Sequence, residues 1–385
     1  MNDLPKISWV ESGESRASLW RSESGVLPPA RVVIADDRLS GDAAYRLACE
    51  GTAMLWRGDY HNARQLLKAL SRRLDRKPRR AERKAPKPMP SLTEAFHLYR
   101  QSQGQRARIL GMLLVWFDSD YRVPLRRAPD VRQACIEAYG PADQASVVSL
   151  CELLGLIGAH EWRKKGVPIP ALEDRIHPHY GVFSPVRGEY VALVAEAPLH
   201  SRELAFDIGC GTGVLAAVLA RRGVVRVVAT DQDPRALACA RENIARLGLS
   251  GHVEVVQADL FPEGRAPLIV CNPPWLPARP SSPLEYAVYD PESRMLLGFL
   301  NGLAAHLEPG GEGWLILSDF AEHLGLRTRD ELLAAIGMAG LKVEGKLDVR
   351  PHHPKASDVA DPLHAARAAE ITSLWRLAAR YVQSC

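Results

Sequence analysis

Hydrophobic positions follow two different patterns along the chain, and the change lies near residue 168. From Glu203 onward, short continuous apolar runs alternate with amphipathic stretches of helical period. The apolar runs predict strands at 203–209, 226–232, 253–259, 266–272, 312–319, 341–349 and 370–378. The amphipathic stretches predict helices at 213–222, 234–247 and 292–307. Strands that alternate with helices pair in parallel, so this part predicts a doubly wound α/β sheet, with its last two strands as an antiparallel edge.

The pattern before residue 168 favours helices instead. Residues 42–74 have helical spacing, and further helices are predicted near 131–139 and 142–157. Ser91 and Glu94 form a capping-box pattern that predicts a helix start. Residues 1–40 are rich in Ser, Glu and Pro, and no strand is expected there. We therefore expect a mainly helical region over residues 1–175, followed by a second domain over 176–385.

Charge divides the chain in the same place. The net charge is +4, but residues 1–175 hold 29 Lys and Arg against 21 Asp and Glu, and the rest holds 20 against 24. Much of the excess lies in one run: Arg72, Arg73, Arg76, Lys77, Arg79, Arg80, Arg83, Lys84 and Lys87. This basic run spans residues 72–87 and overlaps a proline-rich linker predicted at 76–90. It fits a solvated linker or a segment that follows a phosphate backbone, and the absence of aromatic residues slightly favours the linker.

Composition also limits the classes of protein. Residues are 46% hydrophobic and 24% charged, as in globular proteins, and no apolar run is long enough to span a bilayer. The first residues lack the basic start and apolar core of a secretory signal. The seven cysteines form no paired spacing, and the His-Pro-His at 177–179 and His352-His353 lack the matching ligands of a metal site. We expect a cytoplasmic protein with reduced thiols, no membrane partner and no metal.

A glycine-rich turn is the first candidate site. FDIGCGTG, residues 206–213, lies where the first strand of the predicted sheet runs into its first helix. Gly209, Gly211 and Gly213 permit a sharp turn and a close approach of backbone to ligand, beside the free N–H groups of a helix N-terminus. Asp231 ends the second strand, where a carboxylate can accept hydrogen bonds from ribose hydroxyls.

The third strand adds Asp259, followed by Leu260, which could hold an adenine amino group and cover its face. Taken alone, each glycine fits an ordinary turn and Asp231 fits a helix cap. Three consecutive strands that each end in the required residue type favour a ligand site instead. A nicotinamide dehydrogenase is the competing interpretation, but its G-x-G-x-x-G spacing differs from the G-C-G-T-G found here.

DIGCGTG, ATDQDPRAL and QADLF resemble, in order, the first three motifs of the class I S-adenosylmethionine-dependent methyltransferases. The resemblance covers about residues 180–385 and implies the seven-stranded, Rossmann-like fold of that class. It implies that the glycine turn surrounds the amino-acid part of S-adenosylmethionine, that Asp231 binds the ribose, and that Asp259 and Leu260 bind the adenine. The implied cofactor-binding set is Asp207, Gly209, Cys210, Gly211, Gly213, Asp231, Gln232, Asp259, Leu260 and Asn272.

Asn272-Pro273-Pro274-Trp275, at the end of the fourth strand, is the candidate catalytic motif. The lone pair of an amide or exocyclic amino nitrogen is delocalised, so such a nitrogen is a poor nucleophile. The side-chain carbonyl of Asn272 and the backbone carbonyl of Pro273 can each accept one N–H of an NH2 group and orient its lone pair. The prolines stiffen the loop, and Trp275 offers a flat face for a planar group. The alternative is a rigid turn without a ligand, which Asn and Pro also favour.

The tetrapeptide resembles the Asn-Pro-Pro-aromatic motif of the small-domain amino-methyltransferases. That group holds release-factor and ribosomal-protein glutamine methyltransferases and several ribosomal RNA guanine and adenine methyltransferases. They usually carry Tyr or Phe where this chain has Trp275, so the acceptor cannot be transferred from them. HYGVFSPVRGEYVALV, residues 179–194, looks like the stretch before the cofactor motif in the glutamine enzymes. That likeness makes Phe183, Pro185 and Arg187 candidate substrate residues.

Two functions stay open at this point. The first is an enzyme that methylates a planar amide or exocyclic amino nitrogen, in an RNA base or a protein glutamine. Its N-terminal region would recognise an anionic partner such as RNA or the ribosome, or a protein substrate. The second is a catalytically inactive methyltransferase-fold module that binds nucleic acid or a protein partner. The intact motifs favour the enzyme.

Overall fold

The computed structural model describes residues 5–75, 90–280, 285, 287–351 and 358–380. Its chain divides into two compact units. Unit 1 comprises residues 1–89 and 97–161, and unit 2 comprises residues 90–96 and 162–385. The division lies inside a helix near residue 161, whereas the sequence suggested residue 175.

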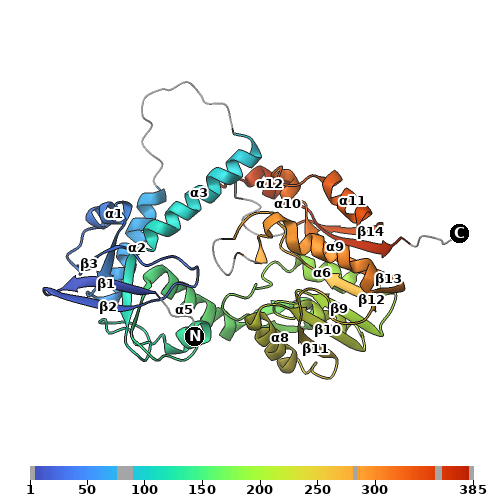
Figure 1. Cartoon of the computed structure of the whole chain (residues 1–385), viewed down its shortest axis with the longest axis horizontal. Coiled ribbons are helices and arrows are strands. Elements are labelled where there is room, and N and C mark those ends of the chain that lie inside the picture. The colour runs from blue at the N-terminus through green and yellow to red at the C-terminus, as the bar shows by residue number, and fades with distance from the viewer. Residues whose placement is uncertain (1–4, 76–89, 281–284, 286, 352–357, 381–385) are drawn as a thin grey trace. The chain divides into compact units, whose positions relative to one another are not determined.

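Unit 1 holds a six-stranded mixed sheet, in the order β1-β2-β6-β5-β4-β3, with helices connecting its strands (Figure 1). The elements of this part of the chain are β1 (Lys6–Glu11), β2 (Glu14–Trp20), β3 (Arg31–Ala35), α1 (Gly41–Cys49), β4 (Thr52–Trp56), α2 (Tyr60–Asp75), α3 (Leu92–Leu110), β5 (Leu113–Phe117), α4 (Arg132–Tyr139), β6 (Ser146–Ser149) and α5 (Leu150–Lys165). The first turn of α3 and the last turn of α5 belong to unit 2.

The prediction of a mainly helical region without strands is therefore wrong. β4 lies within the segment that we expected to be helical, and all five of its residues are buried. A fully buried strand has apolar residues on both faces and cannot be distinguished from a buried helix by periodicity. The β1–β2 hairpin lies within the first 40 residues, where Ser12 and Gly13 both adopt the positive φ of a tight hairpin turn.

The predicted helix start at Ser91 is confirmed. The Ser91 side chain accepts a hydrogen bond from the backbone N–H of Glu94, and the Glu94 carboxylate accepts one from the backbone N–H of Ser91. These two bonds are the reciprocal pair of a capping box. The predicted helix near 131–139 is confirmed as α4. Of the basic run, Arg72 and Arg73 lie in the last turn of α2, and its members from Arg76 to Lys87 lie outside the described residues.

Unit 2 contains a seven-stranded sheet in the order β11-β10-β9-β12-β13-β15-β14. The elements after α5 are β7 (Val167–Ile169), a 3-10 turn (Pro170–Leu172), β8 (Asp174–Ile176), α6 (Glu189–Glu196), β9 (Leu204–Ile208), α7 (Val214–Arg221), β10 (Arg226–Asp231), α8 (Pro234–Arg246), β11 (Val253–Gln257), β12 (Ala266–Cys271), a 3-10 turn (Pro291–Ser293), α9 (Arg294–His306), β13 (Leu307–Ser318), α10 (Phe320–His323), α11 (Arg329–Met338), β14 (Leu341–Val349), α12 (His364–Ala369) and β15 (Thr372–Ala379). All seven predicted strands are confirmed.

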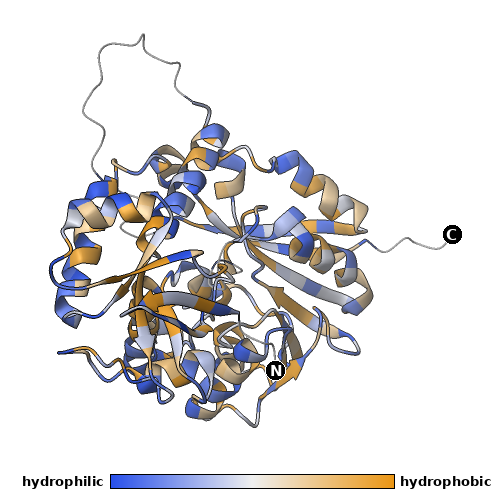
Figure 2. Cartoon of the chain, turned by 60° about the vertical axis from the view of Figure 1, so that its left-hand side comes forward, coloured by the Kyte–Doolittle hydropathy of each residue, from blue (hydrophilic) through white to orange (hydrophobic). Residues whose placement is uncertain are grey.

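Alternating side chains of this sheet enter two separate hydrophobic cores. Val270 belongs to a core shared with α6, α7 and α8, whereas Ile269 and Cys271 belong to a core shared with α9 and α11. The sheet is thus a middle layer between helices, and its central strands β9 and β12 are buried along almost their whole length. Figure 2 shows that hydrophobic residues are concentrated in strands and on parts of the helices. β9, β10, β11, β12 and β13 run parallel, and β15 pairs antiparallel with both β13 and β14. The predicted antiparallel edge is confirmed.

Candidate active site

The strand register of unit 2 brings three segments to one edge of the sheet. Ile208 of β9 pairs with Thr230 of β10 on one side and with Cys271 of β12 on the other. The glycine turn follows Ile208, Asp231 follows Thr230, and Asn272 follows Cys271. Because these strands are parallel, all three segments leave the sheet at the carboxyl ends of its strands, where ligands bind in open α/β sheets.

The glycine turn needs its glycines for different reasons. Gly209, Gly211 and Gly213 all have positive φ, at 71°, 54° and 77°. A Cβ on Gly209 would lie 2.3 Å from Cε of Met295, and one on Gly213 would lie 3.2 Å from Cβ of Ala240. A Cβ on Gly211 would meet no atom within 4 Å. A side chain at Gly209 would therefore require Met295 to move, and one at Gly213 would require a small shift of Ala240, whereas Gly211 borders open space.

Asp207 places a carboxylate beside this turn from inside the sheet. Its side chain is buried, and Oδ2 accepts a hydrogen bond of 3.0 Å from the backbone N–H of Ala216 in the first turn of α7. Burial raises the pKa of Asp207 to about 7, because a charged carboxylate loses its hydration there. Perturbed carboxyl groups of this kind cluster at functional sites.

Asp231 connects the glycine turn to the next strand end. Its Oδ2 accepts a hydrogen bond from the backbone N–H of Gly211 and its Oδ1 accepts one from that of Asp233, both at 3.0 Å. Burial raises the pKa of Asp231 as well. The backbone N–H of Cys210 donates to the Thr230 carbonyl, and the exposed Gln232 follows Asp231 directly. These hydrogen bonds fix the position of the glycine turn relative to the end of β10.

Asp259 and Leu260 lie just past the end of β11. Asp259 is exposed and lies 3.7 Å from Arg294 in an ion pair between two solvated side chains. Leu260 has a φ of 72°, and its carbonyl accepts a hydrogen bond of 2.6 Å from the Thr230 hydroxyl. Its side chain packs toward α9, where a Cβ on Gly298 would lie 2.6 Å from Leu260 Cδ1. The strand β11 itself ends at Gln257, two residues before Asp259.

The Asn-Pro-Pro-Trp segment follows β12 and contains an internal side-chain hydrogen bond. The indole N–H of Trp275 donates a hydrogen bond of 2.9 Å to Oδ1 of Asn272. Pro273 is buried, and no described residue donates a hydrogen bond to its carbonyl oxygen. Trp275 packs against both hydrophobic cores at the end of the sheet. The Asn272 carbonyl is therefore oriented by Trp275 and retains one lone pair for a further donor.

The three candidate substrate residues have different environments. Pro185 is buried, and Phe183 packs against the same core as Trp275. The Arg187 guanidinium lies 5.6 Å from the centre of the Trp275 ring. It donates a hydrogen bond of 3.1 Å to Glu370. The structure thus brings Arg187 to Trp275, and it places Phe183 against the hydrophobic core that Trp275 also borders.

Sequence reasoning missed Glu370. Its side chain is buried, and its second oxygen accepts a hydrogen bond of 2.7 Å from the hydroxyl of Ser318 at the end of β13. Glu370 precedes β15, and Ser318 pairs with Thr372 at the start of that strand. The sequence does show a carboxylate directly before an apolar strand. The position of Glu370 beside Ser318, however, depends on an antiparallel register that cannot be inferred from the sequence.

The strand order and the paired strand ends make unit 2 a Rossmann-like class I methyltransferase fold. Residues 174–325 match the family model of the methyltransferase small domain. The similarity to this family concerns these residues and not the whole chain. The family resemblance inferred from the three motifs and the Asn-Pro-Pro-Trp segment is confirmed.

Named relatives match part of the chain. A release factor glutamine methyltransferase of Cereibacter sphaeroides is 34% identical over 43% of this chain and 63% of its own length. A ribosomal protein L11 methyltransferase of Pelotomaculum thermopropionicum is 51% identical over 17% of this chain and 22% of its own length. A methyltransferase structure from Pyrococcus furiosus covers 59% of this chain and 98% of its own, with 20% identity and a TM-score of 0.39. The chain thus spans less than two thirds of the length of these two curated relatives.

Two further findings concern the described residues alone. None of their helices is both long and apolar enough to cross a membrane. No group of three or more His, Cys, Asp or Glu side chains among them is arranged to hold a metal ion. His179 instead lies 2.7 Å from Glu242, and His177 contacts the Arg163 carbonyl at 2.6 Å.

Proposed function

We propose that this protein is an S-adenosylmethionine-dependent methyltransferase that acts on a planar amide or exocyclic amino nitrogen. The observation that carries the proposal is the pairing of Ile208 with Cys271. This register sets the Asn272 carbonyl and the glycine turn at adjacent strand ends, as transfer between two bound molecules requires.

The residues around the glycine turn fit S-adenosylmethionine. Gly211 borders open space, so a ligand can approach the backbone there. The buried Asp207 carboxylate suits the ammonium of the amino-acid part, because a cation nearby would compensate its lost hydration. Asp231 lies at the strand end where a ribose would be bound, and Leu260 offers an apolar side chain for the adenine. Bound S-adenosylmethionine would supply an electrophilic methyl group.

The chain's own task is to orient the acceptor nitrogen. The Asn272 and Pro273 carbonyls would each accept one N–H of the acceptor, which directs its lone pair out of the plane. Both oxygens would also stabilise positive charge as it develops on that nitrogen. Trp275 holds the Asn272 amide through its indole N–H, and Arg187 covers part of the same indole. No side-chain base is needed, since the nitrogen loses its proton after the new bond forms.

The acceptor class we propose first is a protein side-chain amide. Three relatives with matches of 149 residues or more are named as release factor glutamine methyltransferases or a ribosomal protein L11 methyltransferase. An exocyclic amino group of an RNA base is the second candidate, because it offers the same planar NH2 to the two carbonyls. The inactive module remains the non-enzymatic alternative.

Calorimetric titration with S-adenosylmethionine, followed by transfer of a radiolabelled methyl group to fractionated protein and RNA, tests this proposal. We expect cofactor binding and label in the protein fraction. Asn272→Ala should abolish transfer and leave cofactor affinity within about twofold, whereas Asp231→Ala should weaken the affinity itself by about tenfold. Absence of cofactor binding would support the inactive module, and full activity of Asn272→Ala would refute the acceptor site.

A further inference from the structure

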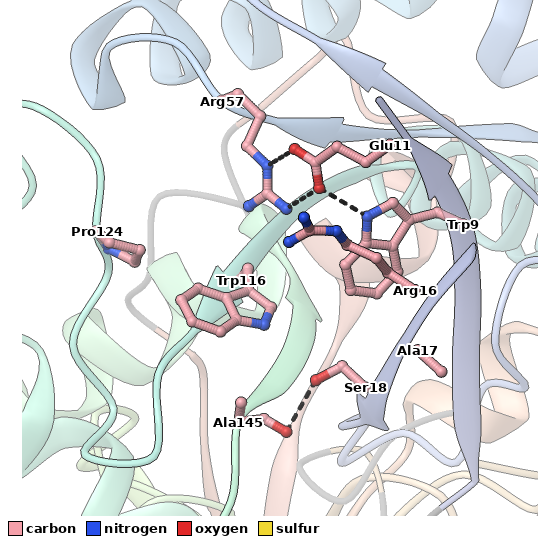
Figure 3. A pocket seen from close by; sticks show the side chains of 9 residues that line it. All are labelled: Trp9, Glu11, Arg16, Ala17, Ser18, Arg57, Trp116, Pro124 and Ala145. Atoms are coloured by element: carbon pink, nitrogen blue, oxygen red, sulfur yellow. Dashed lines mark hydrogen bonds and ion pairs between the residues drawn. The ribbon is translucent and has the colours of Figure 1, made fainter. Parts of the chain in front are cut away.

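Unit 1 has a pocket of its own, distant in sequence from the methyltransferase motifs. β1 and β3 stand at opposite ends of the strand order, yet β1 packs against β3, so the sheet curls toward closure. Its inner face is built from strand side chains: Ile7, Trp9, Trp20, Ala53, Leu55, Leu114 and Val147. The pocket measures about 530 Å³ and lies at the mouth of this curled sheet (Figure 3). That volume is in the range of small-molecule sites.

Position in the fold also favours a ligand. Arg57 directly follows β4, and Trp116 lies near the end of β5. β3, β4 and β5 are parallel, so the pocket lies at the carboxyl ends of these strands. In α/β sheets this edge is where ligands bind, because the connecting loops supply polar groups around the strand ends.

The side-chain oxygens in the pocket each already take part in a hydrogen bond. Arg57 binds Glu11 through two hydrogen bonds of 2.8 Å, and the indole N–H of Trp9 donates to Glu11 at 3.0 Å. The Arg57 hydrogen bonds lower the pKa of Glu11 to about 2, so this carboxylate stays ionised and paired. The Ser18 hydroxyl donates to the Ala145 carbonyl at 2.9 Å.

Donors and one aromatic face remain available. Arg16 is half exposed and makes an ion pair of 3.4 Å with the exposed Glu14, a contact of small worth in water. Nη1 of Arg57 and the indole N–H of Trp116 have no hydrogen-bond partner among the described residues. Trp116 is only partly buried, so part of its ring faces the pocket. The pocket therefore suits a planar group that carries acceptors or negative charge.

We propose that this pocket binds an unpaired nucleotide of a single-stranded nucleic acid, with its base against Trp116 and a phosphate at Arg16. Base stacking on an aromatic side chain beside arginine donors is how proteins hold single strands. The partly exposed ring of Trp116 favours a nucleic acid over an acidic peptide, because a nucleobase stacks on an aromatic face and a carboxylate does not. The proposal does not depend on methyl transfer.

Fluorescence anisotropy of the full chain with a labelled ten-nucleotide oligouridine tests it. Trp116→Ala should weaken binding about tenfold or more, while Trp116→Phe, which keeps an aromatic face, should weaken it by no more than about threefold. Trp162→Ala removes a half-exposed tryptophan of unit 2 and should leave binding unchanged.

A charge-matched pair of variants provides a second, independent measurement. Arg16→Ala should weaken binding about threefold to tenfold and reduce the slope of log affinity against log salt by about one. Arg38→Ala removes the same charge from an exposed pair outside the pocket and should change neither quantity. These exposed sites keep the test valid if Trp116→Ala fails to fold.

Four outcomes would overturn the proposal. They are no binding of the oligonucleotide, wild-type binding by Arg16→Ala or by a folded Trp116→Ala, and equal losses in Arg38→Ala and Arg16→Ala. The fourth is displacement of the oligonucleotide by an acidic peptide but not by excess unlabelled strand.

Discussion

Asp207 and Asn272 are the two side chains of unit 2 on which the proposed cofactor and acceptor sites depend most. Asp207 is buried with one oxygen bonded to the N-terminus of α7, and Asn272 is held by the Trp275 indole. In the folded chain the pKa of Asp207 lies above its ordinary value of 3.8, at about 7. The native state then keeps a proton that the unfolded state has lost. The contribution of Asp207 to stability therefore falls as the pH rises from about 4 to about 7.

Cofactor binding should release a proton near neutral pH. If the ammonium of S-adenosylmethionine approaches Asp207, it lowers the pKa of that carboxyl again, and the proton leaves to the buffer. Calorimetric titrations at about pH 6.5, in buffers of different ionisation enthalpy, should show a release that disappears above about pH 8. Asp207→Asn should remove the release. Binding heats that do not depend on the buffer would contradict the role of Asp207.

Trp275→Phe separates the indole N–H from the aromatic face. The variant keeps a ring beside Arg187 but leaves Asn272 without its donor. A neutral hydrogen bond is worth about 1 kcal/mol, so kcat should fall about fivefold while the KM for the cofactor stays the same. Steady-state kinetics on the methyl acceptor measure both constants. A change in the cofactor KM alone would place Trp275 in the cofactor site instead.

At the scale of elements, the turn between β9 and α7 combines a glycine-dependent backbone conformation with the proposed cofactor site. The sequence predicted each strand of this sheet, because buried parallel strands form short apolar runs between amphipathic helices. It predicted none of the six strands of the unit 1 sheet. The hairpin strands have less regular hydrophobic patterns, and β4 is buried along its whole length and therefore lacks an alternating pattern. The candidate site was predictable in its residues because its motifs are local in sequence.

Gly211→Ala tests whether the open space at this turn belongs to a ligand. Gly211 and Gly248 both have positive φ, and a Cβ on either would meet no atom within 4 Å. Alanine should therefore cost each position a similar stability of about 1 kcal/mol, which thermal melts would measure. Only Gly211→Ala should weaken S-adenosylmethionine binding, by about tenfold or more in calorimetric titration. Equal affinities in the two variants would place the cofactor elsewhere.

For the whole molecule, the division into two units predicts two unfolding events. A cofactor that binds the native state of unit 2 raises the stability of that unit by about 2.7 kcal/mol at a hundred times its Kd. One transition in scanning calorimetry should then rise by about 5–10 °C while the other stays in place. The same measurement with oligouridine should raise the other transition. A single transition that both ligands shift would show that the units unfold together.

The sequence by itself determined the seven strands of unit 2, the order of its motifs and the chemistry available at each strand end. Such features depend on neighbours along the chain, through apolar periodicity, turn residues and helix caps. Only the tertiary structure decided that Glu370 meets Ser318 and Arg187, that Trp275 donates to Asn272, and that β1 packs against β3 in the sheet that carries the pocket of unit 1. These contacts depend on strand register, sheet curvature and side-chain direction. Such quantities are set by packing between segments distant in sequence, which a local pattern cannot encode.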